Sequence, residues 1–315
     1  MSSIIYNGHE IQDLIINGNQ AQLWLNGQKI YPSAEPVDPY NPLGLPPFTI
    51  RVKFNSSFTP SQGTVVLVDP VQHIWDITYD LVDGILPIEY NVRRYMTELL
   101  GANTSGVTGL QSAFNGSRLI TTVPLFDTRS CTNMYGMFSY CKSLTTIPLF
   151  DTSSCTNMNS MFDGCRSLTS VPLFNTSSCT TMSDMFRDCT SLISVPLFNT
   201  SSCTDMMSMF IRCSSLTTVP LFDTSSCTDM NTMFYGCTAL TSVPLFDTSS
   251  VTDMGYMFNG CVNVQSGALA LYQQASTQAT PPSSHSNCFT NCGRDTVTGA
   301  AELAQIPSSW GGTMA

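Results

Sequence analysis

The chain has 315 residues, of which 42% are hydrophobic and 11% are charged, so it can form two or three folded units with a sizeable core. Its net charge of −10 argues against binding to a nucleic-acid backbone, which requires a basic surface. No apolar run approaches the roughly 18 residues of a membrane span, so we expect no membrane insertion. The first residues also lack a signal-peptide pattern, which predicts a protein left in the cytoplasm unless an assembly carries it out.

Residues 1–32 contain three Asn-Gly dipeptides between short apolar segments. This pattern is typical of tight β-hairpins and predicts a small β-meander of three or four strands. A unit of this size is marginally stable alone, so we expect it to be an anchor that docks on a partner or on copies of itself. Trp24 and Tyr31 are expected to form the core of this anchor, and a ligand platform is the alternative.

Residues 33–47 hold five prolines and are expected to be a stiff, extended linker. An α+β module follows at residues 48–100. The stretches FTIRVKF and GTVVLVD alternate and are rich in β-branched residues, which predicts strands, and residues 92–100 are predicted to be a helix. We expect this module to cap the next unit and to cover its exposed edge.

A 24-residue unit recurs through residues 101–268 and is clearest as LFDTSSCTDMNTMFYGCTALTSVP at 221–244. One degenerate copy and six unbroken copies predict seven turns. A single turn cannot bury its own apolar side chains, whereas stacked turns bury them against one another. The expected fold is therefore mainly β with short helices, arranged as a solenoid of seven turns.

Two spacings occur inside each copy. Leu144, Ile147 and Leu149 follow LxxIxL, which predicts a short strand with these side chains pointing inward. The next segment spaces its apolar residues at three and four, as in Met158 and Phe162, which predicts a short helix or 3₁₀ segment. An S-x-x-D pattern at its start predicts a capping box, and glycines after the Met-Phe pair predict left-handed stops.

Eleven of the 13 cysteines occupy two positions of the unit. Val107 and Val251 replace cysteine at the first of these positions, so this position accepts an apolar side chain. We therefore predict buried free thiols, with occasional cross-links between turns as the alternative.

The motifs DTSSxTDM, MFxGC and LTSVP resemble the leucine-rich repeats of the BspA type, which occur in bacterial and protozoan surface proteins, mycoplasma lipoproteins and bacteriophage structural proteins. The resemblance covers about half of the chain and implies a leucine-rich-repeat solenoid that serves display or adhesion without catalysis. The stretches PLGLPPFTIRVKF, LVD and LLGANTSGVTGL also resemble the lead-in before such repeats in proteins of gut Bacteroides and their phages. That similarity implies a tail or fibre protein located in the virion, and a location on the bacterial cell surface is the alternative.

Residues 269–315 are expected to close the solenoid, with helices at 268–278 and 298–305 and an echo of MFxGC at 288–293. The only metal-like spacing joins His285, Cys288 and Cys292, and without a fourth ligand we expect a capping turn and no metal. Aspartates at the third and ninth unit positions, counted from the leucine that begins each copy, could form calcium ladders. Asparagine or threonine replaces them in several copies, which favours turn and capping bonds.

Some unit positions vary while the frame is copied, and tyrosine and arginine are frequent there. Variation of this kind is typical of a recognition surface. Arg118, Lys142 and Arg166 share one unit position in three consecutive turns, so their charges require a negative partner. Nearby aspartates at 163, 184 and 188 could supply it, and the alternative is an anionic ligand such as an acidic polysaccharide or a partner's carboxylates. The candidate binding residues are Arg118, Tyr135, Tyr140, Lys142, Arg166, Arg187, Arg212, Tyr235 and Tyr256.

No catalytic motif is present, because the three histidines lie in different segments and there is no nucleophile elbow or phosphate loop. We therefore predict a non-enzymatic virion appendage without a cofactor, whose residues 1–32 bind other virion proteins and whose solenoid binds a host glycan or protein. A homo-oligomer is compatible with this prediction. The alternatives are a bacterial surface adhesin and a surface-glycan hydrolase, which would need a pair of carboxylates in a cleft.

Overall fold

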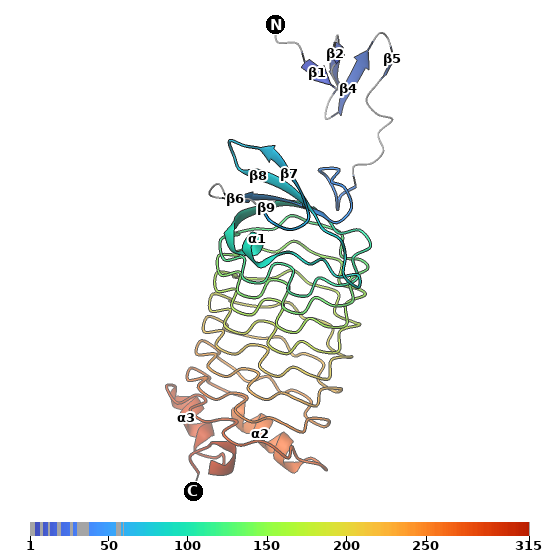
Figure 1. The fold of residues 1–315 in the computed structure, drawn as a ribbon. Coiled ribbons are helices and arrows are strands. Elements are labelled where there is room, and N and C mark those ends of the chain that lie inside the picture. Colours follow the sequence, from blue (N-terminus) through green and yellow to red (C-terminus); the bar gives the residue numbers. More distant parts are fainter. Residues whose placement is uncertain are drawn as a thin grey trace.

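The computed structural model describes residues 38–54, 58 and 60–314, together with the backbone of five short strands between residues 4 and 29 (Figure 1). Two small antiparallel sheets replace the predicted single meander. The first pairs β1 (Ile4–Tyr6) with β2 (His9–Ile11), and the second orders β3 (Asp13–Asn17), β4 (Gln20–Leu25) and β5 (Gln28–Lys29) side by side. The predicted anchor residues Trp24 and Tyr31 lie outside the residues whose side chains are described, so their role stays a prediction.

The cap module contains a four-stranded antiparallel sheet in the order β7-β8-β6-β9. The predicted strands are β6 (Thr49–Phe54) and β7 (Thr64–Asp69), and both are confirmed. A further strand, β8 (Ile74–Thr78), was not predicted and pairs with both of them. Figure 1 shows this sheet at the start of the solenoid.

The helix predicted at 92–100 is wrong for most of its length. Helix α1 (Tyr90–Tyr95) ends early, and β9 (Met96–Asn103) pairs with β6 instead. Met96, Leu99 and Ala102 are buried although they are three residues apart. Two register shifts against β6 explain this spacing, because each inserts one extra residue and returns the next apolar side chain to the same face.

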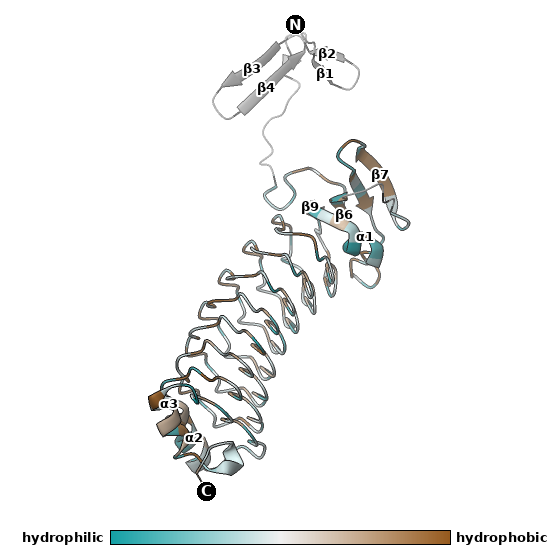
Figure 2. Ribbon diagram, turned by 90° about the vertical axis from the view of Figure 1, so that its left-hand side faces the viewer, coloured by the Kyte–Doolittle hydropathy of each residue, from teal (hydrophilic) through white to brown (hydrophobic). Residues whose placement is uncertain are grey.

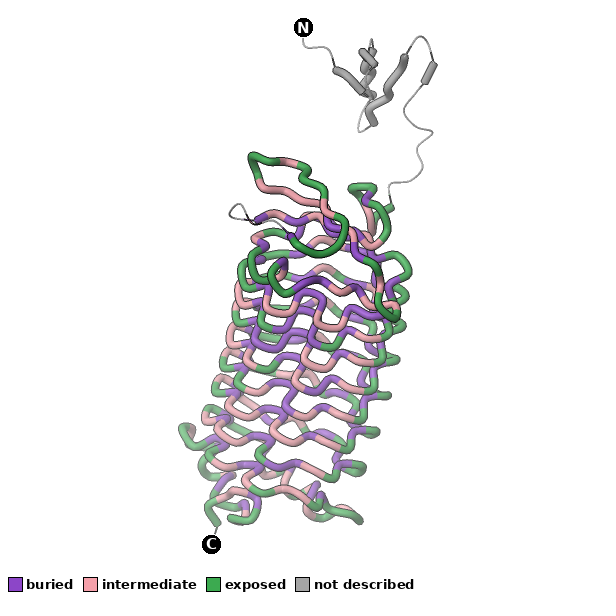
Figure 3. The backbone as a smooth tube through the Cα atoms, in the orientation of Figure 1, coloured by how far each residue is buried: buried purple, intermediate pink, exposed green. Residues whose placement is uncertain are grey.

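The repeat units stack as successive turns, as Figure 1 shows, and buried residues recur at matching places in successive turns in Figure 3. Parallel bridges join the ninth unit position of each turn to that of the next. The bridges connect Gly109, Asn133, Asn157, Thr181, Asp205, Asp229 and Asp253 in this order. The predicted mainly β repeat fold with few helices is confirmed.

The main backbone ladder lies in the segment that was predicted to be a short helix. Four alternate N–H groups of each turn, at unit positions 10, 12, 14 and 16, donate to carbonyl oxygens of the next turn, as Phe138 does to Met161 at 2.9 Å. Between them lie tight turns such as the bond from the Met137 N–H to the Met134 oxygen at 3.1 Å. The chain enters the left-handed region at positions 12 and 16, for example at Ser160 and Gly164. A helix cannot continue through such residues, so the apolar spacing of three and four arises from successive turns.

The LxxIxL segment does not form a regular β-strand. The predicted inward orientation of its side chains is also wrong at the final leucine. Leu149 is 60% exposed, whereas the following Phe150 is buried. The Phe150 N–H donates to the Pro148 oxygen at 3.0 Å, a three-residue turn that swings Leu149 outward and Phe150 inward. The equivalent leucines form an exposed leucine row with 52–60% exposure, which comprises Leu149, Leu173, Leu197, Leu221 and Leu245.

Aromatic and hydroxyl side chains repeat along the interior. Phenylalanines at unit position 14 stack from turn to turn, as Phe162 does on Phe186 with ring centroids 5.7 Å apart. A buried threonine at position 4 bonds the next turn, as the Thr176 hydroxyl does to the Asn199 oxygen at 2.7 Å. These contacts join each turn to its neighbours, so no turn has a core of its own.

All 13 cysteines are buried free thiols in the structure, and the predicted burial is confirmed. Cysteines at unit position 17 also donate to the previous turn, as the Cys189 thiol does to the Phe162 oxygen at 3.1 Å. Burial raises the pKa of the cysteine thiols at both unit positions. The pKa of Cys203, at position 7, is raised to about 11. The thiols are therefore poor nucleophiles as well as small apolar side chains.

The C-terminal cap continues the ladder of the solenoid. The Phe258 N–H donates to the Cys288 oxygen at 2.8 Å, which confirms the echo of MFxGC. The predicted helices are α2 (Ala268–Thr277) and α3 (Val297–Leu303), and a 3₁₀ turn, η1 (Ser308–Trp310), follows. Figure 2 shows the turns edge-on between these helices and the cap module. None of the helices in the described residues has the length and apolar character to cross a membrane.

His285 occupies a packed turn in this cap. Its ring lies 4.2 Å from the Trp310 ring, and its Nδ1 is 3.1 Å from the Pro282 oxygen. Among the described residues, no group of three or more histidine, cysteine, aspartate or glutamate side chains has the arrangement of a metal site.

Candidate binding surface

The aspartates at the third and ninth unit positions form turn bonds. The Ser225 N–H donates to Asp223 Oδ1 at 3.1 Å, and the Asn231 N–H donates to Asp229 Oδ1 at 2.8 Å. These bonds confirm the turn interpretation, but they replace the predicted capping box, because no helix follows. The Ser225 hydroxyl and N–H lower the pKa of Asp223.

The nine candidate residues lie between unit positions 11 and 18 of their turns. Tyr135 and Tyr140 are 46% exposed and Tyr256 is 42% exposed, so these rings are available to a partner. Arg118 and Tyr256 are six turns apart, which is roughly 29 Å at the usual spacing of stacked strands. The candidates therefore cannot all belong to one compact site.

The predicted stack of positive charges divides into two parts. Arg187 Nη1 lies 3.4 Å from Asp184 Oδ1, and Arg212 Nη1 lies 3.8 Å from Asp188 Oδ1. The aspartates thus neutralise the two later arginines. In contrast, the described residues give no ion pair to the earlier members of the stack, Arg118, Lys142 and Arg166.

Asp163 lies at the boundary between these two parts. It is only 8% exposed, and its Oδ1 has no hydrogen-bond partner in the structure. Burial raises the pKa of the Asp163 carboxyl to about 6, although Arg187 opposes the shift. The charge of Asp163 in turn raises the pKa of Tyr140.

A groove of about 430 Å³ lies between α1 and the first two turns. It brings together two of the candidate residues, Arg118 and Tyr140, with three tyrosine or arginine residues that were not predicted, Tyr90, Arg94 and Tyr95. A signal for the missed residues exists in the sequence, because residues 93–94 are the only adjacent basic pair in the chain and have tyrosines close by. The lining residues are Tyr90, Arg94, Tyr95, Asn115, Gly116, Arg118, Leu119 and Tyr140.

Arginines fix the helical wall of the groove. Arg93 Nη1 donates to the Ser112 and Asn115 oxygens at 2.8 and 3.2 Å, which holds α1 against the first turn. The Arg94 guanidinium lies 5.6 Å from the Tyr95 ring centroid and 6.0 Å from the Tyr90 ring centroid. These cation–π contacts keep the charge of Arg94 beside the tyrosines, where it remains partly accessible.

Tyr140 forms the opposite wall at unit position 16. Its φ is 58°, in the left-handed region that this position adopts in every turn. Gly116 and Gly164 occupy the position in the turns on either side, and Asp188 and Arg212 occupy it in later turns. The exposed ring of Tyr140 in the groove lining, and not its backbone, makes this tyrosine a candidate for a binding role.

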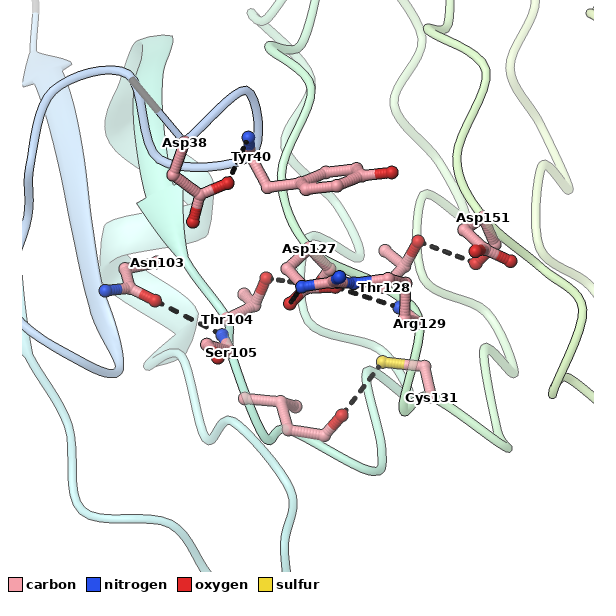
Figure 4. A network of polar contacts seen from close by, with 11 residues as sticks. Asp38, Tyr40, Asn103, Thr104, Ser105, Asp127, Thr128, Arg129, Cys131 and Asp151 are labelled. Carbon is pink, nitrogen blue, oxygen red and sulfur yellow. Dashed lines mark hydrogen bonds and ion pairs between the residues drawn. The ribbon is translucent and has the colours of Figure 1, made fainter. Parts of the chain in front are cut away.

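A second contact joins the linker to the solenoid (Figure 4). Arg129 replaces the serine found at the fifth position of the other five unbroken copies. It forms two bonds with the Asp127 carboxylate, at 2.8 and 2.9 Å, and its guanidinium lies 4.9 Å from the Tyr40 ring centroid. The hydrogen bonds from Arg129 lower the pKa of Asp127. The end of the proline-rich linker therefore rests against the first unbroken turn.

Two stretches, residues 90–192 and 169–270, match the model of the family described as "Mycoplasma protein of unknown function, DUF285". Together they cover more than half of the chain. The chain belongs to the DUF285 family. The DUF285 match begins at the first residue of α1 and extends into α2, so it includes the groove and the stacked turns.

Two solved structures are similar to this DUF285 protein. The leucine-rich repeat protein of T. pallidum has 20% identity and a TM-score of 0.40, with 62% of this chain and 82% of that protein covered. A leucine-rich repeat protein from Eubacterium ventriosum has 19% identity and a TM-score of 0.39, with 54% of this chain covered. The alignment spans 43% of the Eubacterium protein, so this chain corresponds to less than half of its length. No curated protein matches the chain.

Proposed function

We propose that this protein is a non-enzymatic binding protein whose solenoid presents a recognition surface to a host glycan or protein. The observation that carries the proposal is the groove, where exposed tyrosines gather with two arginines that form no ion pair with any described residue, on an otherwise copied frame. Tyrosine and arginine are the side chains that most often anchor binding interfaces. The stacked turns supply a rigid support for them, because their backbone bonds recur from turn to turn.

The composition of the groove favours binding over hydrolysis. Glycoside hydrolysis requires two carboxyl groups on either side of the bond that is cleaved. The eight described residues that line the groove include two arginines and no carboxylate. Incubation with surface glycan should therefore release no sugar, and measurable release would contradict this part of the proposal.

We further propose that residues 1–32 attach the protein to a larger assembly, namely the tail or head fibre of a bacteriophage. A separate β unit followed by a proline-rich linker suits an anchor that holds a binding domain at a distance. The exposed leucine row suits contact with a neighbouring protein, because contiguous apolar surface usually marks an interaction site.

A bacterial cell-surface adhesin is the second candidate. The family match favours it, because the description of the family names a mycoplasma protein, and mycoplasmas are bacteria. Both candidates use the same surface, but they differ in where the N-terminal unit is attached.

Gold-labelled antibody against residues 1–32 distinguishes the two candidates. Label on purified phage particles would support the virion assignment, whereas label on the envelope of producing cells without phage would support the adhesin. Binding of the purified full chain to intact host cells tests the shared part of the proposal. Failure to bind cells, envelope glycans and virion proteins would contradict it.

A further inference from the structure

We propose that the groove between α1 and the first two turns binds a carboxylated sugar unit of an acidic polysaccharide. This inference rests on the proposed binding function and specifies its ligand. It assigns the charge of the sugar to Arg94 and Arg118, and the ring of the sugar to the tyrosines around them.

The groove is positively charged in an acidic protein. The chain has a net charge of −10, yet the described residues that line the groove include two guanidinium groups and no acidic side chain. Arg94 and Arg118 have no carboxylate partner among the residues that the structure describes. A guanidinium group binds a carboxylate through two parallel hydrogen bonds, which makes a carboxylated ligand the natural partner of this site.

The tyrosines of the groove suit a sugar. Tyr140 presents a flat ring with a polar end, and Asn115 adds an amide to the lining. Tyr90 and Tyr95 hold Arg94 against their rings, and the Tyr90 hydroxyl accepts a bond from Arg94 Nη1 at 3.3 Å. The ring of Tyr140 can cover the C–H face of a sugar while its hydroxyl bonds the polar edge of the sugar. Among the eight described lining residues, Leu119 is the only aliphatic one, so this lining does not supply the apolar pocket that an acidic peptide would use for an anchor residue.

Positive charge continues from the groove along the solenoid. Lys142 and Arg166 follow Arg118 at the same unit position, one in each of the next two turns. Successive turns are roughly 4.8 Å apart, so these charges form a regular series that leads away from the groove. A linear polymer with repeated carboxylates can contact both the groove and this series, whereas a single small anion cannot.

Unit position 16 carries a tyrosine only in the turn that borders the groove. The position is left-handed in every turn and holds glycine in four of them, and Asp188 and Arg212 in two others. Gly116 has open space where a Cβ would lie, which leaves the groove accessible beside Tyr140. The ring of Tyr140 therefore stands next to an open part of the groove, where a sugar ring can reach it.

The test is a titration of the full chain with two carboxylated polymers, an oligogalacturonate and polysialic acid. Each polymer is compared with its methyl ester, which keeps the sugar and removes the charge. We expect binding to at least one of the acids and a loss of at least about tenfold for its ester, because one charge-assisted hydrogen bond contributes about that much. Poly-glutamate of equal charge tests for binding that depends on charge alone.

Matched variants locate the site. Arg94→Gln and Arg118→Gln should each weaken binding about tenfold or more. Arg294→Gln is the control, because Arg294 is exposed and paired with its neighbour Asp295, away from the groove. Tyr140→Gly should also weaken binding while the thermal midpoint is retained.

Three outcomes would overturn the inference: no binding to either acid, equal binding of acid and ester, or tighter binding of poly-glutamate. If the chain binds host cells but neither acid, the ligand assignment fails and the proposed binding function stands. If it binds neither cells nor polymers, both fail.

Discussion

The ring of Tyr140 lies over Gly164 of the next turn, so closely that a Cβ built on Gly164 would be 2.8 Å from Cδ1 of Tyr140. Gly164 also has a φ of 69°. The tyrosine that lines the groove therefore depends on the absence of a side chain in the turn that follows.

We expect Gly164→Ala to lower the free energy of unfolding by roughly 1–2 kcal/mol for the left-handed backbone, with a further loss because the Tyr140 ring must move. Gly260→Ala is the control, since Gly260 has a similar φ of 77° but its nearest neighbour would be 3.7 Å away. Urea denaturation measures both. Equal losses in the two variants would show that the contact between Tyr140 and Gly164 has no effect.

The carboxyl of Asp163 should reduce stability as the pH rises. Its pKa is raised to about 6 in the folded state, so the folded protein holds this proton more tightly than the unfolded chain. Stability from this group is then complete below about pH 4 and is lost as the pH rises through about 6. We expect Asp163→Asn to be more stable than the original chain at pH 8, by roughly 2–3 kcal/mol, with little difference at pH 4.

The control for this prediction is Asp223→Asn. The pKa of Asp223 is lowered by Ser225, so its contribution is lost on acidification, which is the opposite direction. Denaturant unfolding at pH 4, 6 and 8 compares the two variants. A stability gain for Asp163→Asn that does not change with pH would refute the explanation.

The buried threonine bonds between turns should contribute more than their exposed equivalents. Thr200 is 1% exposed, and its hydroxyl donates to the Asp223 oxygen at 2.7 Å. Thr200→Val keeps the shape but removes the donor of this bond between turns, at a cost of about 1 kcal/mol. Thr180→Val removes an exposed bond of 3.2 Å, and we expect less than about 0.5 kcal/mol. Thermal unfolding of both variants checks the difference, and a larger loss for Thr180→Val would contradict it.

The contact between Arg129 and Tyr40 should hold the linker without stabilising the solenoid. We expect Arg129→Ser, which introduces the residue of the other turns, to increase hydrogen exchange and proteolysis at residues 38–47. The unfolding midpoint should change little, because Arg129 is largely exposed. Unchanged exchange at residues 38–47 would mean that this contact does not order the linker.

The repeat made the core predictable from sequence, because a position that is apolar in every copy must be covered when the copies stack. Phe162 and Cys189 are buried for this reason, and the ends at α2 and α3 follow from ordinary helix patterns. The path of the backbone was less predictable. The left-handed residue at position 16 is glycine in only four turns. In other turns it is a residue such as Tyr140 or Arg212, whose identity does not indicate a left-handed backbone.

Two further features depend on contacts that a repeat pattern does not contain. Leu149 points outward because a turn at Pro148 reverses the expected alternation. The groove exists because β9 pairs with β6 and leaves α1 only six residues long, next to the first turn. The bonds from Arg93 to the Ser112 and Asn115 oxygens place α1 beside the first turn, and local apolar spacing does not contain such contacts, so it could not predict this site.

The central claim is that the outward side chains of the groove recognise a host surface while the stacked interior only supports them. The most direct measurement is binding of the full chain to intact host cells, beside a triple variant with Arg94→Gln, Arg118→Gln and Tyr140→Gly whose thermal midpoint is recorded in parallel. We predict that the original chain binds, and that the variant keeps its midpoint within a few degrees but binds at least about tenfold more weakly. Equal binding by a folded variant, or no binding by the original chain, would contradict the claim.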